Sequence, residues 1–187
     1  MEAGSVRKSR TYDMVYIGVF AVLMAICSWI AIPTAIPFTL QTFAVFLSVA
    51  VLGGRRGTLA VVVYTLLGLV GIPVFSGFTG GIGILMGNTG GYILGFIFSA
   101  LLMWAIERIF GRKNWILAVS MVLGLIVCYG FGTLWFMAVY THNFGAIGLT
   151  TVLGWCVFPY IIPDLVKIAL ALLISQRLSK VIRIGQD

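Results

Sequence analysis

Residues 159–174 read Pro159-Tyr-Ile-Ile-Pro163-Asp164-Leu-Val-Lys167-Ile-Ala-Leu-Ala-Leu-Leu-Ile174, which places an acid and a base inside a strongly apolar run. In a helix that rises about 1.5 Å per residue, Asp164 lies ~20 Å and Lys167 ~15 Å from Arg177, the first basic residue beyond the run. Both side chains then fall well inside a hydrocarbon slab about 30 Å thick. An ionisable group at that depth costs at least about 2.5 kcal/mol, so it normally faces a protein interior or watery cavity and marks a candidate functional site.

The spacing of the two charges supports a shared role. Residues i and i+3 lie on one helix face, where Asp164 and Lys167 can address one small molecule together. The alternative is that each charge only neutralises the other, although a purely apolar helix would be cheaper. Because proline fits the first turn of a helix, a new helix is expected to begin near Pro163, with the dipole favouring an ionised Asp164 in its first turn. Broken helices at this depth are typical of transporter substrate sites.

Composition identifies the membrane as the solvent. The chain has 187 residues, 61% hydrophobic and 9% charged, against about 25% charged in a soluble domain. The net charge of +7 does not indicate nucleic acid, because the basic residues form short clusters between apolar runs. Cys27, Cys128 and Cys156 lie far apart, and His142 is the single histidine. No metal site is therefore expected; the cysteines should pack as small apolar residues and His142 should be solvated.

Apolar runs near the length of a membrane span predict the fold. The predicted fold class is an all-α integral membrane protein with six transmembrane helices. The expected organisation is an N-terminal segment over residues 1–12, a membrane domain over residues 13–178 and a tail over residues 179–187. The six spans are placed roughly at 13–33, 38–54, 57–72, 90–107, 115–138 and 150–177, and the second to fourth are short.

The basic residues predict the orientation. Of the twelve lysines and arginines, eleven fall in the N-terminal segment, in the connections after the second and fourth spans, or from Arg177 at the end of the sixth span onward; the twelfth is Lys167. The connections 34–37, 73–89 and 139–149 contain no lysine, arginine or acid. The positive-inside rule therefore predicts that both termini are cytoplasmic.

The outer connection between the third and fourth spans is rich in glycine, uncharged and apolar. Such a segment is a poor solvated loop, so residues 73–89 are predicted to fold back over the bundle as a lid or re-entrant cap. Gly87, Gly91 and Gly95 repeat every four residues, which suits tight helix packing at least as well as ligand contact. The segment has no G-x-G-x-x-G pattern, so nucleotide binding is not expected.

Two further features are candidates for contacts. Gln41 carries an amide among apolar residues, which can donate to one ligand atom and accept from another; alternatively it satisfies backbone loosened by Pro33 and Pro37. Ala21 and Ala25 are small residues four apart, so they can form a docking face for another helix, although small residues are common in membrane helices. The uncharged fifth span is interpreted mainly as scaffold.

Together, the cap, Gln41, Asp164 and Lys167 describe a pocket entered from outside. A carboxylate accepts N–H donors and an ammonium donates to carbonyl oxygens, so the ligand should offer both groups on a largely apolar body. A channel is disfavoured because no ring of polar residues repeats along a pore. An enzyme is disfavoured too, since no catalytic cluster or second interior acid is present. Any ATP energy would have to come from separate subunits.

Several phrases, in chain order from about residue 12 to residue 178, resemble the BioY family, the biotin-specific substrate-binding (S) components of energy-coupling-factor transporters. These phrases are Ile36-Pro-Phe-Thr-Leu-Gln41-Thr-Phe43, Leu52-Gly-Gly-Arg55-Arg-Gly57, Tyr64-Thr-Leu-Leu-Gly-Leu-Val-Gly71-Ile-Pro73-Val-Phe75, Thr89-Gly-Gly-Tyr92 with Gly95-Phe96, and Pro163-Asp164-Leu-Val-Lys167.

The resemblance implies a six-helix protein of the prokaryotic cytoplasmic membrane that captures biotin from outside, without cofactor or metal. Its implied partners are a transmembrane coupling subunit and two cytoplasmic ATPases. Asp164 and Lys167 would contact the ureido ring of biotin, and Gln41 would line the same pocket. The turn Thr89-Gly90-Gly91-Tyr92 would line it as well, and Ala21 and Ala25 would meet the coupling subunit.

One position departs from the family pattern. The family commonly has proline before Thr-Gly-Gly-Tyr, whereas this chain has Asn88, so either the loop geometry differs or the amide adds a contact. No outer lysine or arginine can bind the biotin carboxylate, which leaves backbone N–H groups of the cap as candidates. The rival hypotheses are an S component for another small vitamin and a non-transporting scaffold whose charged pair is structural.

Overall fold

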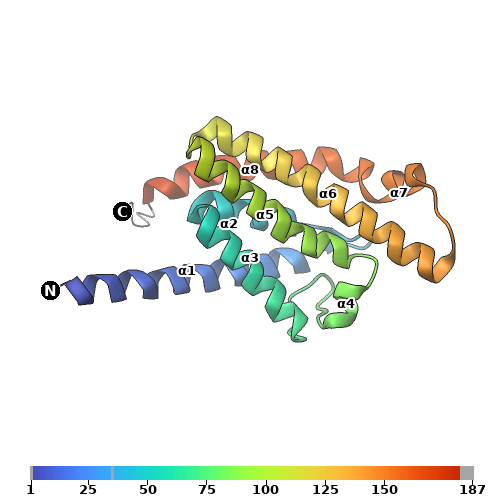
Figure 1. Cartoon of the computed structure of the whole chain (residues 1–187), viewed down its shortest axis with the longest axis horizontal. Coiled ribbons are helices and arrows are strands. Elements are labelled where there is room, and N and C mark those ends of the chain that lie inside the picture. The colour runs from blue at the N-terminus through green and yellow to red at the C-terminus, as the bar shows by residue number, and fades with distance from the viewer. Residues whose placement is uncertain (1, 35, 182–187) are drawn as a thin grey trace.

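The structure, a computed structural model, describes residues 2–34 and 36–181. Within these residues the chain is mostly helical, as predicted, and has one short two-stranded sheet (Figure 1). The elements in chain order are α1 (Glu2–Trp29), β1 (Ala31–Ile32), β2 (Phe38–Thr39), α2 (Gln41–Leu52), α3 (Gly54–Leu69), α4 (Ile82–Met86), α5 (Gly90–Phe110), α6 (Asn114–Phe144), α7 (Leu149–Cys156) and α8 (Phe158–Val181).

Four of the described helices are long and apolar enough to cross a membrane, namely Thr11–Trp29 within α1, α5, α6, and Phe158–Leu178 within α8. The predicted second and third spans are also helical, but α2 has 12 residues and α3 has 16. At about 1.5 Å per residue they measure roughly 18 and 24 Å, less than a hydrocarbon slab of about 30 Å. The count of six spans therefore stays a prediction.

The first predicted span ends earlier than expected. α1 stops at Trp29, and Ala31–Ile32 pairs antiparallel with Phe38–Thr39. Pro33 and Pro37 explain the change, because a residue before proline is driven toward extended backbone and away from a helix. The short sheet brings the carbonyl of Thr39 to a fixed place beside α8, where it becomes part of the site described below.

The prediction that a helix begins near Pro163 is wrong. The chain breaks at Val157, between α7 and α8, and α8 then runs unbroken from Phe158 with Pro163 inside it. Pro159 instead occupies the first turn, where its missing N–H costs nothing. Asp164 follows in the second turn, beyond the part of the helix where the dipole acts strongly. Its charge is therefore stabilised by side-chain partners rather than by a helix end.

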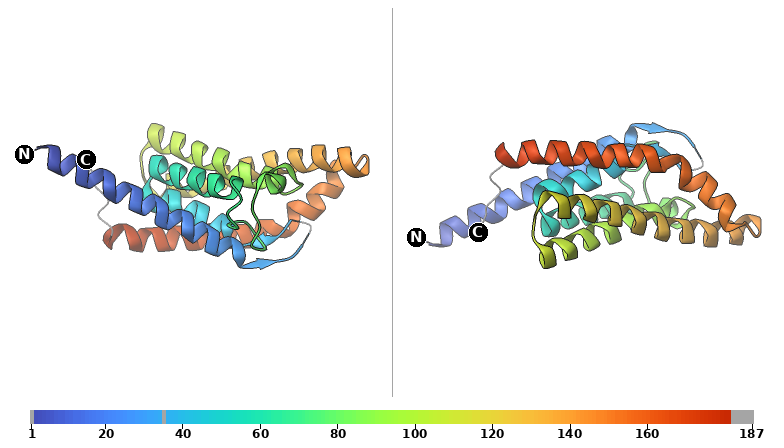
Figure 2. Two further views of the ribbon diagram at one scale, coloured as in Figure 1. Left: turned by 90° about the horizontal axis from the view of Figure 1, so that it is seen from below. Right: turned by 90° about the horizontal axis from the view of Figure 1, so that it is seen from above.

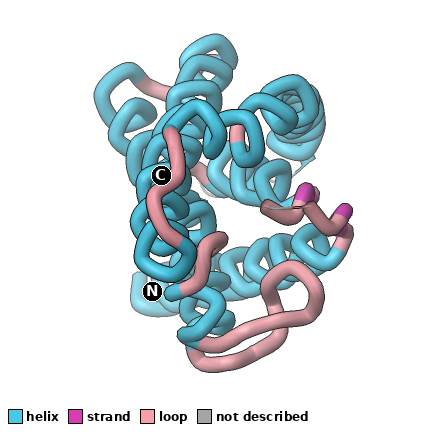
Figure 3. Tube along the Cα trace, turned by 90° about the vertical axis from the view of Figure 1, so that its right-hand side faces the viewer, coloured by secondary structure: helices cyan, strands magenta, loops and turns pink. Residues whose placement is uncertain are grey.

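The long helices α1, α5, α6 and α8 run roughly along the long axis of the bundle (Figure 1), and the basic residues gather at one of its ends. The start of α1, the α2–α3 turn, the α5–α6 turn and the end of α8 lie at one end of the bundle, at the left of Figure 1, and Figure 2 shows the same arrangement from two other sides. Figure 3 looks onto the opposite end and shows the sheet and the long loop on that side. The predicted inner basic residues within the described part of the chain thus belong to segments at one end, and Arg183 lies outside the described residues.

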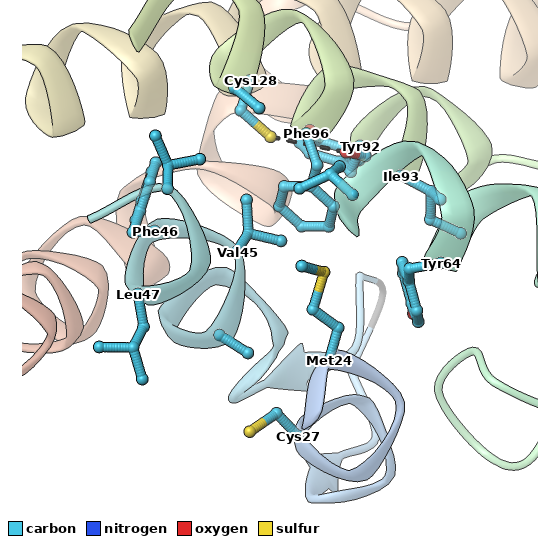
Figure 4. Close-up of a cluster of buried hydrophobic side chains, with 14 of the residues drawn as sticks. Met24, Cys27, Val45, Phe46, Leu47, Tyr64, Tyr92, Ile93, Phe96 and Cys128 are labelled. Atoms are coloured by element: carbon cyan, nitrogen blue, oxygen red, sulfur yellow. Dashed lines mark hydrogen bonds between the residues drawn. The ribbon is translucent and has the colours of Figure 1, made fainter. Parts of the chain in front are cut away.

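α2 lies at the centre of the bundle, in contact with α1, α3, α5 and α8. All its residues except Phe43 are buried, as expected of a helix that is hydrophobic on every side. Figure 4 shows Met24 of α1 pointing toward Val45 of α2, with Phe96 of α5 and Tyr64 of α3 beside them. This core fixes α2, whose first residue is Gln41.

The glycine repeat serves helix packing at two of its three positions. A Cβ added at Gly91 would lie 2.2 Å from Cβ of Trp135, and one at Gly95 would lie 3.2 Å from Sγ of Cys128. Both contacts join α5 to α6, whose close approach therefore depends on the missing side chains. Gly87 instead caps the end of α4.

The predicted cap, residues 73–89, lies within the segment 70–89 between α3 and α5, which includes α4. Phe75 is buried, and a Cβ at Gly68 would lie 2.0 Å from its ring. The ring therefore packs directly against the backbone at Gly68, where a side chain would clash. Phe75 pairs with Thr79 through backbone hydrogen bonds, and Phe78 between them has φ of 56° and stacks on Trp29. Three apolar side chains of this loop are exposed, namely Phe78, Ile82 and Met86.

Candidate functional site

A cavity of about 260 Å³ lies inside the bundle. Its wall is formed by α2, α5, α6, α7 and α8, with the sheet region and the 70–89 loop. Most of the wall area is apolar, and polar side chains from several elements reach it, which suits a small-molecule site. The polar lining residues used below are Thr39, Gln41, Ser76, Thr89, Tyr92, Tyr129, Asp164 and Lys167.

Asp164 and Lys167 form an ion pair in this wall and are only 4% and 5% exposed. Nζ of Lys167 lies 2.7 Å from Oδ1 of Asp164 and donates to the carbonyl of Thr39 at 2.6 Å. The hydroxyl of Tyr129 donates to Oδ2 of Asp164 at 2.5 Å. The ammonium also lies 4.0 Å from the centre of the Phe38 ring. Hydrogen bonds and a cation–π contact thus offset the cost of burying both charges.

The segment that carries Thr39 is tied to α8. The hydroxyl of Tyr160 contacts the hydroxyl of Thr34 at 2.7 Å and donates to the carbonyl of Ile36. The Tyr160 ring also lies 6.0 Å from that of Phe38. Because Tyr160, Asp164 and Lys167 share one helix, a single element positions the acid, the base and the backbone oxygen that the base contacts.

Gln41 reaches the same cavity from the start of α2. Its Nε2 donates to the hydroxyl of Tyr64 at 2.9 Å, and that hydroxyl donates to the carbonyl of Val74 at 3.0 Å. Ser28 of α1 donates to the same carbonyl at 2.6 Å. The side chain therefore does not serve the backbone near the two prolines, which was the alternative role. Its Oε1 has no partner among the described residues and remains an acceptor.

The cavity brings together five of the eight residues predicted to contact the ligand, namely Gln41, Thr89, Tyr92, Asp164 and Lys167. Asn88, Gly90 and Gly91 do not line it. Gly90 and Gly91 serve the tight junction between α4, α5 and α6: a Cβ at Gly90 would lie 1.8 Å from the carbonyl oxygen of Leu85. Packing between the helices therefore explains why glycine occupies positions 90 and 91 in this structure.

The interpretation of the fifth span as scaffold missed Tyr129. This residue lies on α6 and is a direct partner of Asp164. The available signal was its hydroxyl, because a tyrosine in an apolar span usually needs a hydrogen-bond partner. Cys128 and Cys156 also line the cavity, and Cys27 is buried in the core, with all three thiols free.

Ala21 and Ala25 do not form an open face. Their side chains are 1% and 3% exposed, and the helices that α1 contacts are α2 and α3 of the same chain. Small residues allow close helix approach, and here that approach is used inside the bundle. Docking of a partner through Ala21 and Ala25 therefore stays a prediction, and in this structure both residues pack inside the bundle. The exposed side of α1 instead carries Met14, Val15, Val19, Val22 and Ile26.

The fold and the site together define a class: a multi-pass helical membrane protein with an internal cavity and a buried ion pair in its wall. The sequence profile described as the BioY family matches residues 3–184. The chain belongs to the BioY family, which confirms the resemblance found in the sequence.

Relatives of similar length carry consistent names. The chain is 40% identical over 169 residues to the biotin transporter BioY of Thermotoga maritima, covering 90% of this chain and 96% of the relative. It is 36% identical over 163 residues to the probable biotin transporter BioY of Pyrococcus horikoshii, covering 87% and 93% of the two chains.

A solved structure shares the fold. It is the S-component for biotin from an ECF-type ABC transporter, and it superposes with a TM-score of 0.79 over 96% of this chain and 95% of its own. The sequence identity is 24%, so this likeness is used for the fold alone.

Proposed function

We propose that this chain is a biotin-specific S component, which captures biotin from outside and delivers it across the prokaryotic cytoplasmic membrane with energy from separate ATPase subunits. Family membership and the names of the relatives support this function. The observation that carries it is the buried pair Asp164 and Lys167 in the wall of a ligand-sized cavity.

The hydrogen-bonding capacity of the pair matches a cyclic urea. An ammonium has three donors, and Lys167 uses two of them on Asp164 and Thr39, which leaves one for a ligand carbonyl. An ionised carboxylate has about four acceptor sites, and Asp164 uses two of them on Lys167 and Tyr129. The remaining sites suit the N–H groups of a ureido ring, which presents two donors and one carbonyl. The acceptor of Gln41 can take the second N–H.

The rest of the ligand would lie against the apolar wall. Ile93, Phe96 and Leu125 line the cavity and suit a sulfur-containing ring and an aliphatic chain. Backbone N–H groups of the cap remain our candidates for the biotin carboxylate. The hydroxyls of Ser76 and Thr89, which also line the cavity, extend that set.

The membrane arrangement is part of the proposal. Six spans with both termini cytoplasmic would put the end of the bundle that carries the basic clusters inside, and the cap outside. The described ends of α1 and α8 lie at one end of the bundle, which supports this arrangement (Figure 2). Docking of the coupling subunit through Ala21 and Ala25 would require α1 to separate from α2 and α3. The exposed side of α1 needs no such movement and is the alternative docking face.

Titration calorimetry of the purified chain in detergent tests the substrate. We expect biotin to bind and a panel of other small vitamins not to bind. Biotin methyl ester should bind more weakly if the carboxylate is held by N–H or hydroxyl donors. If folded protein bound another vitamin and gave no heat with biotin, that vitamin would be assigned as the substrate instead of biotin. If the folded protein bound no vitamin in the panel, the scaffold hypothesis would be favoured.

A further inference from the structure

A second hollow lies at the basic end of the bundle, away from the cavity. It is an open groove of about 1220 Å³ between α1, α3 and α5, closed on one side by the α5–α6 turn. Four arginines line it, namely Arg55, Arg56, Arg108 and Arg112, together with the acids Asp13 and Glu107. The charge of these six residues is four positive minus two negative, so the groove carries a net charge of +2.

Two of the arginines have structural roles. Arg56 pairs with Asp13 at 2.9 Å and joins α3 to α1. Arg112 lies 4.0 Å from Glu107 and donates to the carbonyls of Ala50 and Val51 at the end of α2. These contacts hold the groove in shape.

The other two arginines are not used by the described part of the chain. Arg55 and Arg108 are exposed, and neither has a hydrogen bond or ion pair to any residue that the structure describes. Both line the same groove although they come from different helices, α3 and α5. Two guanidinium groups that line one groove from separate helices suit the planar, bidentate recognition of a phosphate.

The apolar part of the groove indicates what carries the phosphate. Met14 and Leu59 line the groove and are 65% and 43% exposed, and Ile17 lies beside them. In the membrane arrangement proposed above, on which this inference rests, these side chains belong to helices that cross the bilayer from the basic end. A ligand that fills the groove therefore meets cations at one end and an apolar strip that leads into the bilayer.

We propose that this groove binds the headgroup of an anionic phospholipid, with an acyl chain against Met14, Ile17 and Leu59. Basic pockets between membrane helices are a recognised type of site for anionic headgroups. The phosphate would contact Arg55 and Arg108, because Arg56 and Arg112 are already paired. The site would fix the position of α1 against α3 and α5 independently of ligand in the cavity.

Native mass spectrometry of the full chain with phosphatidylglycerol or phosphatidylcholine tests this proposal. We expect wild-type protein to retain phosphatidylglycerol preferentially. Each of Arg55→Gln and Arg108→Gln should lower that preference about fivefold, as expected of one charge near a membrane surface. The matched control is Arg177→Gln, an exposed arginine on α8 that does not line the groove, and it should keep the preference.

Thermal unfolding in phosphatidylglycerol and in phosphatidylcholine nanodiscs gives a second readout. Wild-type and Arg177→Gln should be more stable in the anionic discs, and Arg55→Gln should lose most of that difference. Equal retention of both lipids by wild-type protein would overturn the proposal. So would competition by millimolar inorganic phosphate, which indicates a small-anion site, or unchanged lipid retention with lost binding of the coupling subunit, which indicates a protein interface.

Discussion

The same kind of ion pair occurs in two environments of this molecule. Lys167 and Asp164 meet at 2.7 Å with side chains 6% and 5% exposed, whereas Arg56 and Asp13 meet at 2.9 Å with side chains 26% and 32% exposed. A partly exposed pair contributes about 0–1 kcal/mol. A buried pair costs desolvation that only good geometry offsets, so its presence is weak support for stability and stronger support for a function.

The largest effect is expected from neutralising the buried acid. Asp164→Asn removes a charge-assisted acceptor, so biotin affinity should fall by about 10- to 100-fold. The protein should still fold, because the amide oxygen can accept from Lys167 while the amide NH2 group donates to the hydroxyl of Tyr129. Lys167→Met should likewise fold and bind weakly. Calorimetry beside size-exclusion chromatography measures both properties, and misfolding of both variants with normal binding by the surviving fraction would make the pair structural.

Tyr129 gives the buried pair of Asp164 and Lys167 a third partner. No similar partner is found at the pair of Arg56 and Asp13 in the described structure. Tyr129→Phe removes one hydrogen bond to Asp164, and biotin affinity should fall about tenfold with little change in the unfolding temperature. Tyr140→Phe is the control, since Tyr140 lies on the same helix but does not line the cavity. Equal affinities of the two variants would remove Tyr129 from the site.

A substitution at Gly91 distinguishes a role in helix packing from a role in ligand contact. Gly91→Ala places a methyl group against Trp135 and should destabilise the protein by about 1–3 kcal/mol, as overpacking does. The control is Gly130→Ala on α6, where a Cβ meets nothing within 4 Å. Unfolding in mild detergent measures both variants. A stable Gly91→Ala protein with much weaker biotin binding would restore Gly91 as a ligand contact.

The smallest effect is expected at the partly exposed pair. Asp13→Asn should lower the free energy of unfolding by less than about 1 kcal/mol and leave biotin affinity unchanged. Denaturation curves at low and high salt provide the check, because the small loss should disappear when charges are screened. A loss of biotin affinity in Asp13→Asn as large as that in Asp164→Asn would show that burial does not distinguish the two pairs.

The sequence predicted the site best where a charged residue lies in an apolar, membrane-spanning run. Asp164 and Lys167 stand out in an apolar run, and their spacing correctly places them on one helix face. The helical segments follow from hydropathy for the same reason. Hydropathy indicates which segments lie in an apolar environment, but it does not indicate which side chains contact one another. It therefore did not show that Ala21 faces its own bundle or that Tyr129 contacts Asp164.

Local breaks were harder to place than helices. Two prolines near the start of α8 gave two positions for a break, and the chain breaks before the first of them, at Val157. Proline shows where a helix is weakened, but tertiary contacts decide whether it continues. The same limit applies to Gly90 and Gly91, whose conformational freedom suits a ligand turn and a tight helix junction equally well.

We propose that Asp164 binds the ureido ring of biotin. Calorimetry of a double cycle tests it directly, with wild-type and Asp164→Asn protein titrated with biotin and with an analogue whose ring N–H groups are blocked. We expect each change alone to weaken binding and the two together to be little worse than either one. Independent, additive losses would show that Asp164 acts elsewhere, and would contradict the assignment of the buried pair to the ligand.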